Sequence, residues 1–485
     1  MSNKRIVTDF IWKYMERCAY QGVLGIINIV LARMLAPEHF GELAIITVFV
    51  NLAQAFVQQG LSTALIQARE IHKEDITNIV LANIATATVL YAIIFYTAPL
   101  IADLYNMEQF GDHLRLMALI LFPGCLNSVQ NALIVRSGKY KSLFCVSFIS
   151  AFFSGVVGVM AALNGLEVQA LILQQLSLQI VLCILMMPVV RIKICRPQFT
   201  NVRFVQMYKF GFRLMLSSFL NTLYGDIQTL VIGKLYTQKS LGYYNQGRNY
   251  PYLIIANINT SLNTVLLPAF SKAKSREDIK CLMKNAMSVS TFVIFPLLFG
   301  LCGISKNLVD VLLTSKWNSC VPYLVLFCFI YAFYPLSTIN LQAYNAVGRS
   351  GLYLKNEIAK KIVGIIFLVI FIVLWDSPIA VVISLLVASP VNVLIDSYCA
   401  KSNFNYSIWE QFKDYLPNLI NASFMLAIVL VVGLLPFSTF VVLVLQIISG
   451  SITYLLAAKI YKLRGYTMVV KFVGEYLKSY RNRNK

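Results

Sequence analysis

The chain has 485 residues, of which 58% are apolar and 13% are charged, with a formal net charge of +20 and a mean hydropathy of +0.70. This composition excludes an ordinary water-soluble domain, because most of such a chain must have lipid as its solvent. The positive charge requires no nucleic acid, since the anionic headgroups of membrane lipids are sufficient partners for it.

Windows long enough to cross a bilayer, about 20 mostly apolar residues each, follow one another along the whole chain. They predict an all-α polytopic membrane protein with about fourteen transmembrane helices. A β-barrel is excluded, because its strands alternate in hydrophobicity over segments of about ten residues. The predicted helices cover residues 9–34, 40–65, 76–101, 114–135, 142–164, 167–190, 204–233, 241–268, 285–304, 321–347, 352–375, 378–400, 414–435 and 437–461.

The amino-terminal residues Lys4 and Arg5 precede a long span that contains Glu16 and Arg17. A cleavable signal peptide would instead have a short apolar core followed by small residues. We therefore expect the amino terminus to remain on the chain.

Lys and Arg residues are distributed unevenly between the two sets of loops. The even-numbered loops contain 20 of them and the odd-numbered loops contain 6. Because cytoplasmic loops carry the excess of Lys and Arg, the sequence predicts that the even-numbered loops and both termini are cytoplasmic. These loops are residues 67–75, 136–141, 191–203, 271–284, 348–361 and 401–413.

Two parts of the chain repeat each other at an offset of 201 residues. Residues 31–41 return as 232–242, and residues 61–68 return as 262–269, without a gap. Six predicted helices separate each motif from its copy, so that equivalent helices cross the membrane in the same direction. Parallel repeats of this kind occur in transporters, whose substrate path lies between the repeats.

A third similarity occurs at an offset of 212. Pro123 and Pro335 each lie seven residues before a glutamine, and a short basic turn follows at residues 136–138 and 349–351. It extends the repeat toward the end of each half.

The repeat predicts four parts of the chain. Residues 1–200 and 201–400 form two six-helix lobes, residues 401–462 add two transmembrane helices, and residues 463–485 form a basic cytoplasmic tail. Apolar residues recur in the tail at helical spacing, which suits a helix lying in the membrane interface. An unstructured basic end is the alternative.

Polar residues form stripes on the predicted helices. In the first helix the stripe has spacings of four, four and three, and its copy 201 residues later carries Ser218, Thr222 and Asp226, so both are polar on one face. Uncompensated polar groups in hydrocarbon are costly, and we expect these faces to line a wet cleft, the alternative being amides that only join helices. The candidate cavity residues are Arg17, Gln21, Asn28, Asn51, Gln54, Gln58, Arg248, Asn259 and Asn263.

Asp226, Glu16 and Asp396 are acids inside predicted spans, and intramembrane acids are candidates for coupling to an ion. The coupling ion would be H⁺ or Na⁺. Structural roles stay open, because long side chains near helix ends can reach the interface and Glu16 could pair with Arg17.

Signals for catalysis are nearly absent. The ten cysteines include no Cys-x-x-Cys pair, and His39, His72 and His113 are scattered. Neither a nucleophile-elbow motif nor a phosphate-binding Gly-rich loop occurs. The sequence therefore predicts no catalytic residue, no metal and no cofactor, and the chain is not expected to be an enzyme.

Several helix-end and turn motifs carry a family resemblance: residues 31–41, 64–67, 242–245, 316–317 and 345–350. In these motifs, and over roughly residues 5 to 400, the chain resembles the polysaccharide-transporter branch of the multidrug/oligosaccharidyl-lipid/polysaccharide exporter superfamily, in particular Wzx-type flippases of the colanic-acid kind. Such motifs are specific for the family and carry no information on the substrate.

The resemblance implies a multi-pass protein of the bacterial inner membrane with two six-helix lobes around a cationic cavity. It also implies that the chain moves an undecaprenyl-diphosphate-linked oligosaccharide to the periplasmic leaflet by alternating access, for lipopolysaccharide, capsule or exopolysaccharide synthesis. Some relatives are driven by ion or proton antiport. This chain departs from the pattern because few cationic residues lie deep in its spans.

Such cargo needs cations for its diphosphate and amides for its sugar hydroxyls. Arg17 and Arg248 are the candidates for the first role, and the amide residues of the stripes are the candidates for the second.

Two other functions remain open. A multidrug or metabolite antiporter of the same superfamily would suit the stripes, although such carriers usually stop near twelve helices. A membrane-embedded polymerase or ligase should have a large periplasmic loop, and the odd loops here are short. Genes for glycosyltransferases and a polymerase, which would be functional partners, beside this one would favour polysaccharide export.

Overall fold

The computed structural model describes the chain except for residues 1–2, 59, 68–70, 191, 193–194, 197–201 and 484–485. The side chains of residues 3–11, 61, 67, 202–204, 350, 472–473 and 476–483 also lie outside the description. The predicted loops 67–75 and 191–203, and the faces of the last turns of the tail, therefore fall partly outside the described residues.

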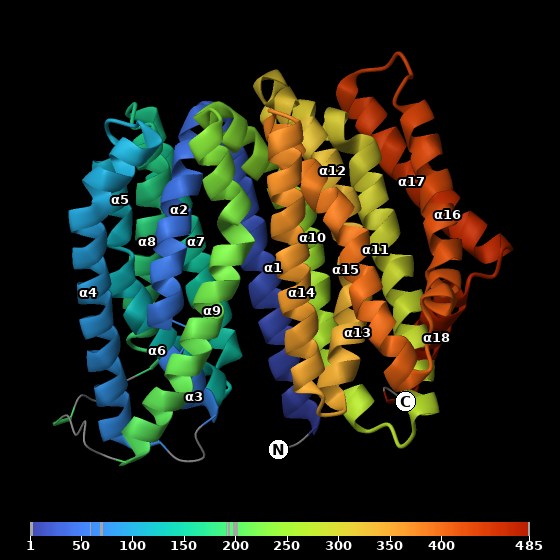
Figure 1. Ribbon diagram of the computed structural model, residues 1–485, viewed down its shortest axis with the longest axis horizontal. Coiled ribbons are helices and arrows are strands. Elements are labelled where there is room, and N and C mark those ends of the chain that lie inside the picture. The colour runs from blue at the N-terminus through green and yellow to red at the C-terminus, as the bar shows by residue number, and fades with distance from the viewer. Residues whose placement is uncertain are drawn as a thin grey trace. The chain divides into compact units, whose positions relative to one another are not determined.

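The described chain is helical and contains no strand (Figure 1), and it divides into two compact units, Met1–Gly242 and Tyr243–Lys485, here called unit 1 and unit 2. The helices of unit 1 are α1 (Asn3–Met34), α2 (Pro37–Gln58), α3 (Gly60–Gln67), α4 (Lys73–Tyr105), α5 (Phe110–Ala118), α6 (Leu121–Ser137), α7 (Tyr140–Leu163), α8 (Val168–Met186) and α9 (Val202–Leu235).

Helix α10 (Gln238–Ser271) begins in unit 1 and continues through unit 2. The remaining helices are α11 (Arg276–Leu313), the 3₁₀ helix η1 (Ser315–Cys320), α12 (Val321–Ala332), α13 (Tyr334–Ala346), α14 (Ser350–Leu374), α15 (Pro378–Phe404), α16 (Ile408–Val432), α17 (Thr439–Ile460) and α18 (Arg464–Arg483).

Every predicted transmembrane window coincides with one helix or with two consecutive helices. Eleven helical segments of the described chain are long and apolar enough to cross a membrane. The other three windows coincide with α1, α9 and α14, which carry more polar and charged residues. The all-α polytopic architecture predicted from the sequence is confirmed.

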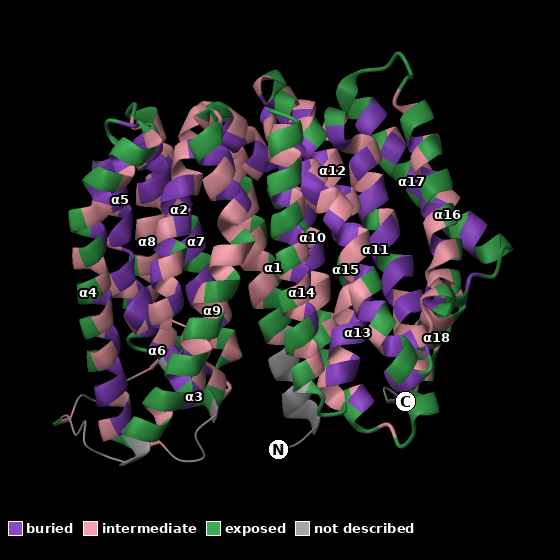
Figure 2. Ribbon diagram, viewed as in Figure 1, coloured by how far each residue is buried: buried purple, intermediate pink, exposed green. Residues whose placement is uncertain are grey.

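The outer faces of several helices are apolar. On α4, for example, Val89, Ile93, Tyr96 and Leu100 are all exposed and follow one another at spacings of three or four residues, so they lie on one face. Figure 2 shows α4 with exposed residues along much of its length. Apolar surface of this extent would be unfavourable in water, and it is the surface expected of a helix that contacts lipid.

Prolines account for two of the helix breaks. The predicted span 114–135 consists of α5 and α6, and the span 321–347 includes α12 and α13. Pro123 and Pro335, which the sequence placed at equivalent positions, lie in the first turns of α6 and α13. Proline is tolerated there because the first N–H groups of a helix have no partner within it.

The turns after these helices correct one detail of the predicted repeat. Gly138 and Gly348 both have positive φ angles, of 67° and 72°, and each is followed by one residue before the next helix begins. Glycine adopts this conformation without steric cost. Gly348, and not Gly351, is therefore the structural counterpart of Gly138, and residues 349–351 already lead into α14.

The helix ends reproduce the offset of 201 residues. Helix α1 ends at Met34 and α9 at Leu235, while α2 begins at Pro37 and α10 at Gln238. The boundaries predicted near residues 200 and 400 describe the repeat and remain a prediction, because unit 1 reaches to the first turn of α10.

The first turns of α2 and α10 contact each other at equivalent positions. A Cβ atom on Gly41 would lie 1.9 Å from the carbonyl oxygen of Gln238, and a Cβ atom on Gly242 would lie 2.0 Å from that of Pro37. Each residue of these two pairs is separated by 201 from its counterpart in the other. Only glycine allows the two helices to approach so closely, and this explains why the repeated motif ends in glycine at both positions.

Candidate functional site

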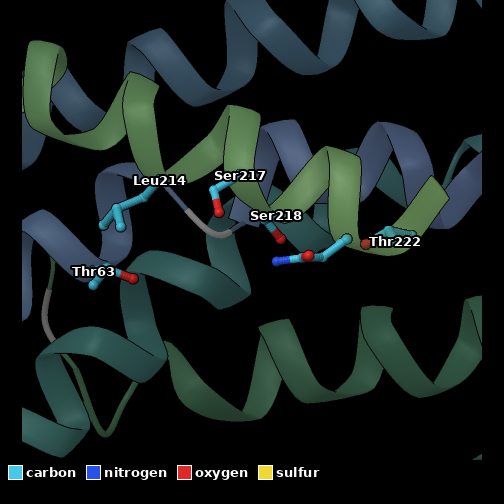
Figure 3. Close-up of a pocket in the computed structure, with 6 residues that line it drawn as sticks. Thr63, Leu214, Ser217, Ser218 and Thr222 are labelled. Atoms are coloured by element: carbon cyan, nitrogen blue, oxygen red, sulfur yellow. The ribbon is translucent and has the colours of Figure 1, made fainter. Parts of the chain in front are cut away.

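A groove in unit 1 lies between helices α2, α3 and α9. Its larger part has a volume of about 450 Å³ and its smaller part about 200 Å³. The two parts share Ser218 and Thr222 of α9, so they form one continuous groove. Figure 3 shows Ser217, Ser218 and Thr222 on α9, with Thr63 on the opposite wall. The lining residues are Thr63, Leu214, Ser217, Ser218, Asn221 and Thr222 in the larger part, and Asn51, Gln54, Ala55, Gln58, Ser218 and Thr222 in the smaller part.

Close packing at neighbouring points holds the walls of the groove in place. A Cβ atom on Gly60 of α3 would lie 2.6 Å from the carbonyl oxygen of Gly211 in α9. The rings of Phe56 in α2 and Phe219 in α9 pack with centroids 4.8 Å apart. These contacts are possible because residue 211 is also a glycine, and they bring the polar faces of α2 and α9 opposite each other.

The groove offers hydroxyl and amide groups, and none of its lining residues is charged. Serine and threonine hydroxyls donate and accept hydrogen bonds, and asparagine and glutamine amides do both at separate atoms. Such a lining can bind sugar hydroxyls, which also donate and accept. It offers no cation for a phosphate group.

The structure brings three of the predicted cavity residues, Asn51, Gln54 and Gln58, together in this groove. It adds Thr63, Ser217 and Asn221, which the sequence analysis missed. A signal for the last two was available, because residues 214, 217, 218, 221 and 222 have the spacing of one helix face.

The predicted residues of α1 are not among the groove-lining residues. Arg17, Gln21 and Asn28 are half-buried on α1. Glu16 forms an ion pair with Lys13 at 2.9 Å, where the sequence had suggested Arg17 as the partner. Asp226 is half-buried on α9, one turn beyond the groove residue Thr222.

In unit 2 the predicted stripe of α10 is hydrogen-bonded to neighbouring helices. The Nε of Arg248 donates to the hydroxyl of Tyr331 in α12 at 3.3 Å. The Oδ1 of Asn259 accepts from Thr338 at 3.4 Å, and the Oδ1 of Asn263 accepts from Gln342 at 2.9 Å. The two asparagines therefore connect α10 to α13, as expected for amides that join helices.

Asp396 lies at the centre of a buried cluster in unit 2. Its Oδ2 is 3.1 Å from the Nζ of Lys360 in α14 and accepts a short hydrogen bond from Ser337 in α13, while its Oδ1 accepts from Asn356 at 3.2 Å. Lys360 also pairs with Glu357 at 2.5 Å. The acid on α15 is thus bound by donors from two other helices.

Lys360 and Glu357 were missed because the sequence analysis assigned residues 348–361 to a cytoplasmic loop. Helix α14 begins at Ser350, which places both residues two to three turns inside it. A long charged stretch before an apolar run gives no sign of where the helix begins. Their helical spacing of three was the only signal, and it is also common on solvated helices.

Comparisons with known proteins give the family of the chain. The family model described as "Polysaccharide biosynthesis protein" matches residues 30–322, which is more than half of the sequence. The chain belongs to the polysaccharide biosynthesis protein family. The resemblance noted in the helix-end motifs is confirmed.

Among curated relatives, the chain is 26% identical over 321 residues to the lipopolysaccharide biosynthesis protein WzxC of Escherichia coli K12, covering 63% of each chain. It is 24% identical to the succinoglycan biosynthesis transport protein ExoT of Rhizobium meliloti, covering 66% of this chain and 65% of that protein. It thus matches a little less than two thirds of the length of these relatives.

Solved transporters share the fold. The lipid II flippase MurJ in an inward closed conformation aligns with a TM-score of 0.74 at 16% identity, covering 95% of this chain and 99% of that one. An inward-facing multidrug transporter of the MATE family in the MOP superfamily aligns with a TM-score of 0.62 at 15% identity, covering 81% and 99%. At these identities the likeness establishes the membrane-transporter fold.

Proposed function

We propose that the chain is a flippase that moves an undecaprenyl-diphosphate-linked oligosaccharide across the bacterial inner membrane. The observation that carries the proposal is the uncharged groove of unit 1, lined by hydroxyl and amide groups within a membrane-spanning bundle. Sugars are cargo that such groups bind and that cannot cross hydrocarbon unaided. The names of the relatives, which include a succinoglycan transport protein, support the same substrate class.

In this proposal the chain is a carrier and not an enzyme, and it acts beside separate glycosyltransferases and a polymerase. Binding of the cargo would alternate between the leaflets. The 20 to 6 bias in Lys and Arg supports cytoplasmic termini. A cysteine introduced at Lys274 should then resist an impermeant label applied to the periplasmic side.

Deletion of the gene in its host tests the function. We expect lipid-linked repeat units to be synthesised normally and to accumulate on the cytoplasmic leaflet. If the lipid-linked unit is missing altogether, or is exported but not polymerised, the chain acts in synthesis or polymerisation and the proposal is wrong.

A substitution in the groove should block transport without unfolding the protein. Ser218→Leu places a bulky apolar side chain where both parts of the groove meet, and we expect transport to fall at least about tenfold, the equivalent of about 1.4 kcal/mol. Leu220→Met on the same helix is the matched control, because Leu220 is exposed and is not a groove residue. Unchanged flux in Ser218→Leu, at equal protein level, would show that sugars do not pass here.

The two predicted arginines have a separate role in this proposal, as partners of the diphosphate. Arg17→Ala and Arg248→Ala should each impair translocation at near-normal protein levels. Arg→Lys should retain part of the activity, because lysine keeps the charge but loses the bidentate geometry. Asp226→Asn should matter if transport is coupled to an ion. Wild-type flux in both alanine variants would leave the arginines with structural roles.

A multidrug or metabolite antiporter is the second candidate, since MATE transporters share the fold. The two functions differ in their cargo. Stimulation of drug efflux by the chain, with no effect on lipid-linked sugars, would favour the antiporter.

A further inference from the structure

Three ionisable side chains form a compact cluster between α14 and α15 of unit 2. Lys360 lies between the two acids, 2.5 Å from Glu357 and 3.1 Å from Asp396. The side chain of Asp396 is fully buried, that of Lys360 is 11% exposed and that of Glu357 is 28% exposed. Glu357 thus connects a buried pair with the surroundings of the helix.

The charges of this cluster do not balance. When all three groups are ionised, two carboxylates share one ammonium group and the cluster carries one excess negative charge. An uncompensated charge in a buried site is strongly unfavourable. Ser337 and Asn356 donate hydrogen bonds to Asp396, but neither brings a charge.

The other titratable groups at this site are neutral. Tyr344 of α13 donates to the backbone carbonyl of Asp396, and Cys399 of α15 lies 3.5 Å from Asn356. Tyr353 lies one turn before Glu357 on α14. Phenols and thiols of this kind are uncharged near pH 7, so none of them supplies the missing positive charge.

Charged groups on neighbouring stretches have other positions or partners. Lys355 of α14 is exposed and Lys361 is half-buried on the same helix, while Arg349 bonds to Asn403. Helices α11, α12 and α16 also pack against α15. On α11, Lys280 pairs with Glu410 at 2.7 Å and Lys284 pairs with Asp414 at 3.3 Å, and both partners are on α16.

We propose that Glu357, Lys360 and Asp396 form a binding site for one proton, which the two carboxylates share. One proton removes the excess charge and leaves a neutral ion pair. A metal cation fits the site less well, because the ammonium group of Lys360 already occupies the position between the acids. In addition, the described residues contain no group of three or more His, Cys, Asp and Glu side chains that could hold a metal ion.

The site is placed to affect the proposed transport, and in that respect the inference rests on the proposed function. Ser337, which bonds to Asp396, is followed on α13 by Thr338, which bonds to Asn259 in the polar stripe of α10. The proton-free cluster would also repel an anionic diphosphate, whereas the proton-bound cluster would not. Proton binding therefore favours entry of the anionic cargo into unit 2.

Infrared spectroscopy of the full chain in lipid nanodiscs measures the proton directly, through the C=O stretch of protonated carboxyl groups. In the wild type we expect a buried carboxyl band above about pH 5, where carboxyl groups in water are ionised. The band should be lost in Glu357→Gln and in Asp396→Asn, because either change leaves one acid balanced by Lys360. Asp103→Asn, which removes an exposed acid of α4, is the control and should leave the band unchanged.

Persistence of the band in both variants, or its absence from the wild type above that pH, would overturn the proposal. Suppression of the band by Na⁺ at constant pH would also overturn it, because the site would then hold a metal cation. Transport is scored separately. A band without transport of lipid-linked sugar contradicts the proposed function alone, and transport without the band contradicts the proton site alone.

Discussion

Lys360→Met should destabilise unit 2 by about 3 to 5 kcal/mol, because it leaves Asp396 buried without its cation. The carboxylate is fully buried, and Lys360 is the positively charged group that contacts it. Denaturant-induced unfolding in mixed micelles measures the effect. We expect the loss to be smaller at low pH, since protonation removes the buried negative charge that Lys360 would otherwise balance.

Two further variants interpret this result. Lys355→Met removes an exposed lysine of the same helix and should change stability by less than about 0.5 kcal/mol. The double variant Lys360→Met with Asp396→Asn should recover most of the loss, because removing both charges of a buried pair is often neutral. If Lys360→Met is as stable as the wild type, the ion pair does not hold α14 to α15.

Gly41→Ala should prevent stable folding around the first turns of α2 and α10. The added Cβ atom would lie 1.9 Å from the carbonyl oxygen of Gln238, and a backbone atom cannot move aside as a flexible side chain can. Overpacking of a core typically costs about 1 to 3 kcal/mol, and a clash with backbone should reach or exceed the upper value. Yield of folded protein and its unfolding midpoint are the measurements.

Gly22→Ala is the matched control for this prediction. Gly22 lies within α1, and a Cβ atom added there meets nothing within 4 Å, so alanine should be neutral or stabilise the helix by up to about 1 kcal/mol. Gly242→Ala should behave like Gly41→Ala, because its Cβ atom would lie 2.0 Å from the carbonyl oxygen of Pro37. Normal folding of Gly41→Ala would mean that the two helices do not approach as closely as described.

The sequence predicted the helices well because a bilayer demands long apolar segments, and this signal does not depend on tertiary contacts. The offset of 201 residues also predicted the ends of α1 and α9 and the starts of α2 and α10. The breaks inside apolar spans were not predicted. The break at Phe333 between α12 and α13 has apolar residues on both sides, so hydropathy does not change there.

The candidate site was predictable only in part. Helical spacing placed Asn51, Gln54 and Gln58 on one face, and the structure adds the opposite wall on α9. Which face of another helix lies opposite depends on packing, for example on the close approach of Gly60 and Gly211. Spacing could not reveal that Asp396 on α15 meets Lys360 on α14, because the two residues are separated by 36 positions.

A vesicle assay with the purified chain tests translocation of a lipid-linked oligosaccharide most directly. A fluorescent undecaprenyl-diphosphate-linked oligosaccharide is incorporated in both leaflets, and a membrane-impermeant quencher is added outside. We predict that the quencher reaches nearly all of the fluorescence when the wild-type chain is present, and distinctly less when Ser218→Leu replaces it. Quenching confined to the outer-leaflet fraction, as in vesicles without protein, would contradict the flippase function.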